Sequence, residues 1–126
     1  MTLTALPAMT ILYVADVPAS VAFYTARLGL SPVEQSPGFA LFAVPGAGRL
    51  GLWRRDDVVP AVDAPAGGSE LCCPVGTLAA LSALHRDWSN AGVPIAQAPQ
   101  PMDFGVTFTA LDPDGHRLRV FAPAAS

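Results

Sequence analysis

The fold is decided by residues 9–30, which read MTILYVADVPASVAFYTARLGL. The β-branched and aromatic run at the start of this stretch predicts a strand over residues 9–14. Asp16 is a typical helix N-cap, and Pro18 follows in the first turn, where its missing N–H group costs little. Apolar residues then recur at helical spacing as far as Gly29, so we expect a helix that ends at this glycine.

Three short strands are predicted after this helix. They cover residues 32–35, 39–44 and 50–54, with turns rich in Gly and Pro between them. Residues 56–68 contain two prolines, two glycines and few large side chains, a composition that predicts a linker. The first half of the chain therefore predicts a strand, a helix and three strands, followed by a linker.

The second half of the chain repeats this order. A strand is predicted at Glu70–Pro74, and Thr77 is the N-cap of a helix that ends before Gly92. Two or three further strands are predicted, over residues 95–97, 106–111 and 118–121.

This internal repeat predicts the fold class. Two units of this kind form curved mixed sheets that surround a cavity, with the helices outside. We therefore expect one α+β domain over residues 1–126, made of two βαβββ units at about 8–56 and 69–122.

Composition limits the classes of function. Hydrophobic residues make up 52% of the chain and charged residues only 13%, so a single copy has few charges with which to cover its surface. This balance favours a homo-oligomer. The net charge is −3, and the basic residues, all of them arginine, are scattered along the chain, which argues against a nucleic-acid partner.

The sequence also argues against a membrane protein. No apolar run approaches the roughly 20 residues that span a bilayer. Residues 1–8 lack the basic start of a secretory signal, so we expect the cytoplasm.

Nothing in the sequence predicts a catalytic residue. Cys72 and Cys73 are adjacent, which is a poor arrangement for a disulfide, and neither has a basic neighbour that would activate it. We expect both to be core-filling thiols. The chain also lacks a Gly-x-Ser-x-Gly nucleophile elbow.

Several stretches resemble the vicinal oxygen chelate superfamily, which includes glyoxalase I, extradiol dioxygenases, fosfomycin-resistance transferases and bleomycin-binding proteins. Residues 14–24 and 28–30 resemble its first strand and helix, and residues 112–116 resemble its closing hairpin. Residues 50–55, LGLWRR, and 102–105, MDFG, are similar to phenazine-antibiotic-resistance members of the group.

The resemblance implies where a metal would bind. Metalloenzymes of the superfamily hold a divalent ion with His, Gln or Glu, and the matching positions here are Met9, Glu70 and Arg119. A thioether, one carboxylate and a fixed cation do not make a catalytic metal site, so we expect no metal and no cofactor. Instead we expect Glu70 to pair with Arg119. His85 and His116 match no ligand position and are expected on the surface or in packing.

The resemblance also predicts which side chains bind a ligand. Side chains alternate across a strand, so Tyr13 shares the face of Met9, and Arg119 shares that of Phe121. The internal repeat relates Phe121 to Trp53, and three aromatic rings around a pocket favour a planar aromatic ligand. The expected ligand-binding residues are Trp53, Tyr13, Phe121, Phe104, Met102, Arg117, Arg119 and Glu70. The alternative, that the three aromatic residues are only core, stays open, whereas Tyr24 and Trp88 are expected in the core.

Two functions remain in competition at this point. The first is a metal-free binding protein that sequesters a planar aromatic antibiotic or metabolite, as in drug resistance, and acts as a homodimer. The alternative is a glyoxalase-like or dioxygenase-like enzyme of the same superfamily.

Overall fold

The computed structural model describes residues 1–5 and 7–123 and contains two α-helices and eight strands. The elements are β1 (Met9–Val14), α1 (Val17–Leu28), β2 (Pro32–Gln35), β3 (Phe39–Val44), β4 (Gly48–Arg54), a short 3-10 helix η1 (Arg55–Asp57), β5 (Glu70–Pro74), α2 (Leu78–Asn90), β6 (Ile95–Met102), β7 (Gly105–Leu111) and β8 (Arg117–Ala122). Within the described ranges, no helix is long and apolar enough to cross a membrane.

The chain divides into two compact units, Met1–Ala66 and Gly67–Ser126. Each unit contains one helix and one four-stranded mixed sheet, in the order strand, helix and three strands. The predicted α+β class with two βαβββ units is thus confirmed, and the sheets do not close into a barrel over the described residues. That the two units form a single domain stays a prediction.

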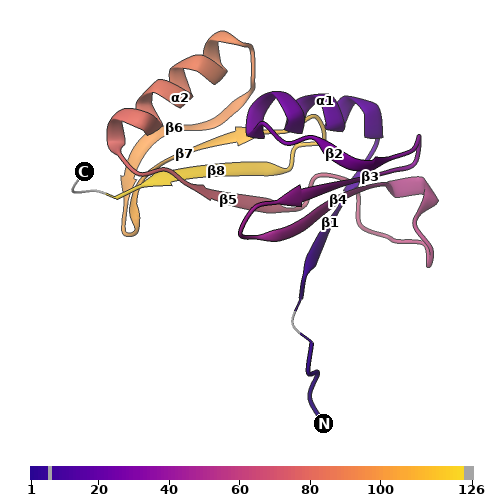
Figure 1. Cartoon of the computed structure of the whole chain (residues 1–126). Helices are drawn as coiled ribbons and strands as arrows, with labels where there is room; N and C mark the ends of the chain where they lie inside the picture. The colour runs from indigo at the N-terminus through magenta and orange to yellow at the C-terminus, as the bar shows by residue number, and fades with distance from the viewer. Residues whose placement is uncertain (6, 124–126) are drawn as a thin grey trace. The chain divides into compact units, whose positions relative to one another are not determined.

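The first unit has the sheet order β1-β4-β3-β2, in which β1 and β4 are parallel and the other pairs are antiparallel. The helix α1 lies along one face of this sheet (Figure 1). The Asp16 side chain accepts a hydrogen bond of 3.0 Å from the Ala19 N–H, as expected of an N-cap. Gly29 ends the helix with a φ of 68°, a conformation that side chains with a Cβ rarely adopt.

Alternation separates the two faces of the first sheet. Leu12, Leu52 and Phe42 are fully buried under α1, where Tyr24 is also buried, as expected. Tyr13 and the other side chains of opposite parity point to the face without a helix, which we name the open face of the unit. The open face is therefore where this unit can meet a ligand.

The second unit repeats this arrangement with the order β5-β8-β7-β6, and α2 lies along one face of its sheet (Figure 1). The Thr77 hydroxyl accepts from the Ala80 N–H at 3.1 Å and caps the helix. The ring of Phe108 packs edge-on between His85 and Trp88, with centroid distances of 5.3 and 5.7 Å. The expected core role of Trp88 and the packing role of His85 are thereby confirmed.

Strand β6 is longer than the sequence predicts. The expected strand covered residues 95–97 only, and the residues that follow include two prolines, at positions 99 and 101, which cannot donate to a sheet ladder. The structure continues β6 to Met102 as the edge strand of its sheet, where an N–H group on the outer side needs no partner. Its pairing with β7 is irregular on both sides of Gln97.

The predicted linker is tied to the first unit by Arg55. Its guanidinium donates to the carbonyl oxygens of Val62, Asp63 and Ala64 at 3.0, 3.3 and 3.0 Å. Val58 is buried, with 6% of its surface exposed. Side-chain bonding of this kind to backbone carbonyls leaves no trace in composition, so the stretch looked like an unattached linker.

The turn before β8 is held by buried polar groups. The Asp112 carboxylate accepts from the N–H groups of Asp114 and His116 at 2.8 and 2.9 Å. The His116 ring is buried, and its Nδ1 lies 2.6 Å from the Ser69 hydroxyl, just before β5. His116 therefore has the expected packing role, and it joins the starts of β5 and β8, the two strands that carry Glu70 and Arg119.

Candidate functional site

The candidate site lies on the open face of the second unit, the side of its sheet that α2 does not cover. Strand β8 buries Leu118 and Val120 toward the helix and turns Arg119 and Phe121 to the open face. The parallel pairing sets Cys72 of β5 beside Arg119. Alternation thus brings charged and aromatic side chains together on one surface.

A cavity of about 490 Å³ opens on this face. It is lined by Glu70, Cys72, Met102, Phe104, Arg119 and Phe121. Except for Cys72, each of these was expected from the sequence to bind a ligand. The volume falls within the roughly 300–1,000 Å³ typical of small-molecule sites. We refer to this cavity below as the apolar pocket.

The tip of the β6–β7 hairpin supplies the apolar wall. Asp103 and Phe104 form the turn between Met102 and Gly105, and Gly105 has a φ of 133°. Met102 and Phe104 remain 42% and 52% exposed, which is unusual for such side chains. The Phe104 ring stands edge-on to Phe121, at a centroid distance of 6.0 Å and an angle of 87°. The hairpin therefore offers aromatic and thioether surface that the unit itself does not bury.

An ion pair closes the other end of the apolar pocket. Arg119 Nε donates to Glu70 Oε2 at 3.0 Å and Nη2 donates to Oε1 at 3.2 Å, so the pair is bidentate. The Arg119 side chain is 16% exposed and that of Glu70 35%. Hydrogen bonding from Arg119 holds the pKa of Glu70 below its ordinary value of 4.5, against the opposing effect of partial burial. The expected pairing is confirmed.

Gln97 was not predicted to belong to the site, yet it extends this ion pair. Its Oε1 accepts from Arg119 Nη1 and from the Thr109 hydroxyl, both at 3.1 Å. Gln97 lies on β6 between two irregular pairings. The sheet face to which its side chain points therefore does not follow from strict alternation along the strand. A polar residue in a strand rich in Pro and Ala was the only signal in the sequence.

Arg117 lies on the same face but outside the apolar pocket. It lines a neighbouring cavity of about 250 Å³ together with Ala96, Gln97, Thr109 and Arg119. Arg119 belongs to both cavities. We refer to this second cavity as the polar pocket.

Cys72 corrects a prediction. It was expected to fill the core, but it is exposed and lines the apolar pocket, because β5 is an edge strand and Cys72 points to the open face. Partial burial and the nearby Glu70 carboxylate raise the pKa of its thiol, which disfavours the thiolate. Cys73 points the other way and is half-buried.

Trp53 and Tyr13 lie on the open face of the first unit. They are directly opposite each other in the parallel β1–β4 pair, and both are partly exposed. The Trp53 ring stands edge-on to Phe39 at a centroid distance of 6.3 Å. A Cβ at Gly51 would come within 2.5 Å of the Ile11 side chain, so this glycine lets the neighbouring side chains close over the sheet. The first unit thus has its own aromatic surface.

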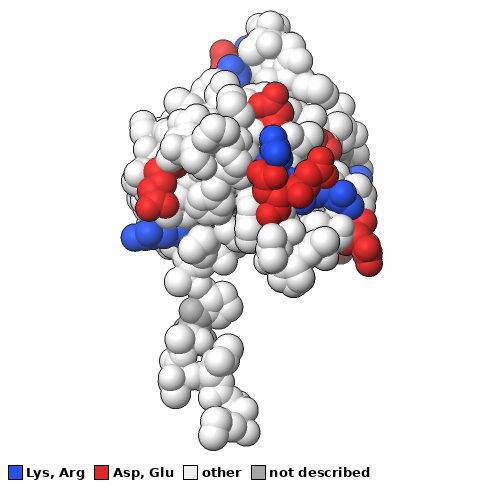
Figure 2. Space-filling view, turned by 90° about the vertical axis from the view of Figure 1, so that its right-hand side faces the viewer, with Lys and Arg blue, Asp and Glu red and all other residues white. Residues whose placement is uncertain are grey.

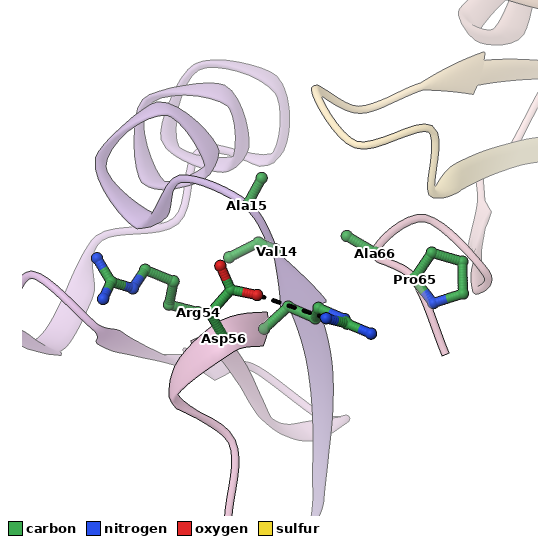
Figure 3. Close-up of a pocket in the computed structure, with 7 residues that line it drawn as sticks. Val14, Ala15, Arg54, Asp56, Pro65 and Ala66 are labelled. Atoms are coloured by element: carbon green, nitrogen blue, oxygen red, sulfur yellow. Dashed lines mark hydrogen bonds and ion pairs between the residues drawn. The ribbon is translucent and has the colours of Figure 1, made fainter. Parts of the chain in front are cut away.

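Another cavity of the first unit, of about 340 Å³, lies where β1 and β4 end (Figure 3). It includes Arg54 and Arg55, but both guanidinium groups are already engaged. Arg54 pairs with Asp57 at 2.9 Å, and Arg55 reaches Asp56 at 3.4 Å besides the three backbone carbonyls. The two charged groups of this cavity are therefore less available to a ligand than the exposed apolar side chains of the apolar pocket.

Charges of opposite sign lie close together on the surface. Figure 2 shows acidic and basic side chains mixed on the face that it presents, with uncharged surface around them. On the face that Figure 2 presents, the described basic side chains lie next to acidic ones and do not form a continuous basic patch.

The side chains at the expected metal positions do not fit a divalent ion. Both carboxylate oxygens of Glu70 accept hydrogen bonds from Arg119, whose guanidinium is a permanent cation. Met9 offers only a thioether, which suits soft metals rather than Mn²⁺ or Fe²⁺.

Comparisons with known proteins match this fold. Residues 6–120 match the model of the Glyoxalase/Bleomycin resistance protein/Dioxygenase superfamily. A phenazine antibiotic resistance protein, EhpR, from Enterobacter agglomerans is 28% identical over 120 residues, which cover 93% of this chain and 92% of that protein.

Two solved structures have a fold similar to that of this chain. A solution NMR structure of a protein from Agrobacterium tumefaciens is 46% identical, covers 96% of this chain and 99% of its own, and has a TM-score of 0.81. A glyoxalase-related enzyme from Fulvimarina pelagi is 22% identical, covers 95% of this chain and 88% of its own, and also has a TM-score of 0.81. The latter likeness concerns the fold alone.

The ion pair predicts energetic coupling between Glu70 and Arg119. Each single change, Glu70→Gln or Arg119→Met, leaves a partly buried partner unpaired, whereas the double change removes both charges. We expect the double variant to lose less unfolding free energy than the two singles summed, by roughly 0.5–1 kcal/mol. Urea unfolding of the four proteins at neutral pH measures this coupling.

The same pair predicts a pH dependence. The pKa of Glu70 is lowered in the folded protein, so its contribution is full above the ordinary value of 4.5 and is lost as the pH falls through the folded value. The coupling should therefore shrink in acid. Strict additivity at neutral pH, or a coupling that acid leaves unchanged, would contradict the pairing.

Proposed function

The chain belongs to the Glyoxalase/Bleomycin resistance protein/Dioxygenase superfamily, and on that premise we propose that it is a metal-free binding protein that sequesters a planar aromatic antibiotic or metabolite. The single observation that carries this proposal is the apolar pocket, in which the exposed Phe104 ring and Met102 thioether of the β6–β7 hairpin tip line one cavity with the Phe121 ring and an ion pair.

The chemistry of the apolar pocket suits a flat aromatic molecule. Phe104 and Phe121 present one ring edge-on to the other, so a third ring can lie flat against either. Each such contact adds roughly 0.5–1.5 kcal/mol beyond the burial of area. The thioether of Met102 adapts its shape to the edge of an inserted ring. These groups bind by contact, and the raised pKa of the Cys72 thiol in the same pocket disfavours its nucleophilic thiolate form.

The relative named as a phenazine antibiotic resistance protein supports the choice of ligand class. Phenazine is a planar, fused, aromatic ring system. The MDFG stretch, residues 102–105, which resembles phenazine-antibiotic-resistance members in sequence, forms the hairpin tip at the apolar pocket.

We propose that Trp53 and Tyr13 of the first unit also contact a ligand. Both lie on an open sheet face and remain partly exposed, as do the aromatic residues of the apolar pocket. Their place on the open face, rather than under α1, supports a role beyond the core.

We also propose that the protein is a homodimer. Few charges cover the surface, and large apolar side chains are exposed on the strands of both units, among them Met9 at 49% and Met102 at 42%. An isologous dimer hides such surface from water.

Phe104→Ala tests the apolar pocket. Because Phe104 is 52% exposed, the change should leave unfolding free energy almost unaltered while weakening phenazine binding by roughly 1–3 kcal/mol. Isothermal titration calorimetry and urea unfolding give the two quantities. The matched control is Val33→Ala, another exposed apolar truncation, which should change neither.

Recovery of the compound completes this test. Phenazine incubated in excess with the protein should be recovered unchanged. The titration should give one bound phenazine per chain. Undiminished binding by Phe104→Ala would place the ligand elsewhere, and conversion of the compound would favour the enzyme alternative.

Trp53→Ala tests the aromatic surface of the first unit. Binding should quench tryptophan fluorescence in the parent, and the variant should lose most of this quenching together with roughly 1–3 kcal/mol of binding free energy. Trp88→Phe is the control, because Trp88 is 2% exposed in the core and its change should lower stability rather than affinity. Parent-like affinity in Trp53→Ala would remove this residue from the site.

The dimer is tested by mass in solution. Light scattering coupled to size exclusion should give twice the chain mass of 13.0 kDa at micromolar concentration. A mass of one chain that stays constant across concentrations would overturn the proposed assembly.

A further inference from the structure

The polar pocket, lined by Ala96, Gln97, Thr109, Arg117 and Arg119, has no role in the function proposed so far. We propose that it is an oxyanion subsite, so that the ligand is a planar aromatic acid whose carboxylate binds at Arg117 and Gln97 while its ring occupies the apolar pocket. This inference rests on the proposed function and deepens it by naming the chemical class of the ligand.

The neighbours of Gln97 fix the orientation of its side-chain amide. Its Oε1 accepts from both Arg119 Nη1 and the Thr109 hydroxyl, so both lone pairs of the amide oxygen are used. The amide nitrogen faces the other way and donates to the Met102 sulfur, a weak acceptor, at 3.6 Å. Gln97 therefore presents N–H donors, in an orientation that Arg119 and Thr109 fix.

The polar pocket contains two arginines, Arg117 and Arg119. Arg119 uses three of its five N–H groups on Glu70 and Gln97, which leaves two. Arg117 is exposed, and its positive charge acts on the Glu70 carboxylate electrostatically, which helps to lower the pKa of Glu70. Glu70 lies directly opposite Arg117 in the β5–β8 pair, but its carboxylate is taken by Arg119.

Positive charge and hydrogen-bond donors are in excess at the polar pocket. Two guanidinium cations face one carboxylate, so the pocket keeps one positive charge. Its side chains offer N–H donors from Arg117, Arg119 and Gln97, whereas the acceptors of Glu70 and Gln97 are occupied. A site with spare donors and positive charge selects an oxyanion, and a planar guanidinium matches a carboxylate in particular.

The apolar pocket and the polar pocket share a lining residue. Arg119 lines both, and Gln97 of the polar pocket contacts Met102 of the apolar pocket. A carboxylate attached directly to an aromatic ring therefore reaches the polar pocket while the ring stays beside Phe104 and Phe121.

The experiment compares phenazine with phenazine-1-carboxylate in calorimetric titrations of the full chain at neutral pH. The carboxylate should bind about tenfold more tightly or better, since it adds a charge-assisted contact. Arg117→Gln should lower the preference for the carboxylate over phenazine about tenfold. Arg86→Gln, which removes an exposed arginine of α2, is the matched control and should alter neither affinity.

Gln97→Glu separates this subsite from a general effect of charge. The glutamate keeps an oxygen acceptor for Arg119 and Thr109 but replaces the outward N–H groups with a negative oxygen. The preference for the carboxylate should be lost, while phenazine still binds.

Equal affinity for the two compounds, or an Arg117→Gln variant that keeps the preference, would overturn the oxyanion subsite and leave the proposed function standing. If neither compound binds, the proposed function fails and this inference fails with it. Inorganic phosphate that binds as tightly as the aromatic acid would also overturn the inference, because the ring would then contribute nothing.

Discussion

The carboxylate of Glu70 accepts two hydrogen bonds from Arg119, and the polar side chains on the open face of the second sheet are arranged around this pair. Arg119 has only partial access to water, so its charge needs a partner nearby. One of the three N–H groups that the pair leaves on Arg119 donates to Gln97, whose amide is oriented in consequence. The pair also marks the border between an apolar pocket and a polar one.

The place of this pair in the fold follows from two strands that start side by side. Glu70 begins β5 and Arg117 begins β8, in parallel register. The buried turn at Asp112 and the contact between His116 and Ser69 hold both starts in place. A guanidinium fixed there occupies, by the family resemblance, a position where metalloenzymes keep a metal ligand, and its planar set of N–H groups suits the recognition of oxygen acceptors.

Much of the fold could be predicted because its signals are local. The caps at Asp16 and Thr77, the glycine that ends α1 and the alternation in β8 depend on residues only a few positions apart. The pairing of Glu70 with Arg119 was also predictable, but only through the family resemblance. By contrast, β6 passes through two prolines at a sheet edge, and its irregular register turns Gln97 toward Arg119. Edge position and register depend on tertiary pairing, which a single sequence does not contain.

The central claim is that a planar aromatic molecule binds at the apolar pocket of the second unit. The most direct test is a two-dimensional ¹H–¹⁵N NMR titration of the 13.0 kDa chain with phenazine-1-carboxylate, which reports on every backbone amide at once. We predict the largest shift changes in residues 102–105 and 117–121, in Gln97 and at Trp53, with little change along α2. Shifts confined to the cavity beside Val14 and Ala66 (Figure 3), or no saturable shift at millimolar ligand, would contradict the account.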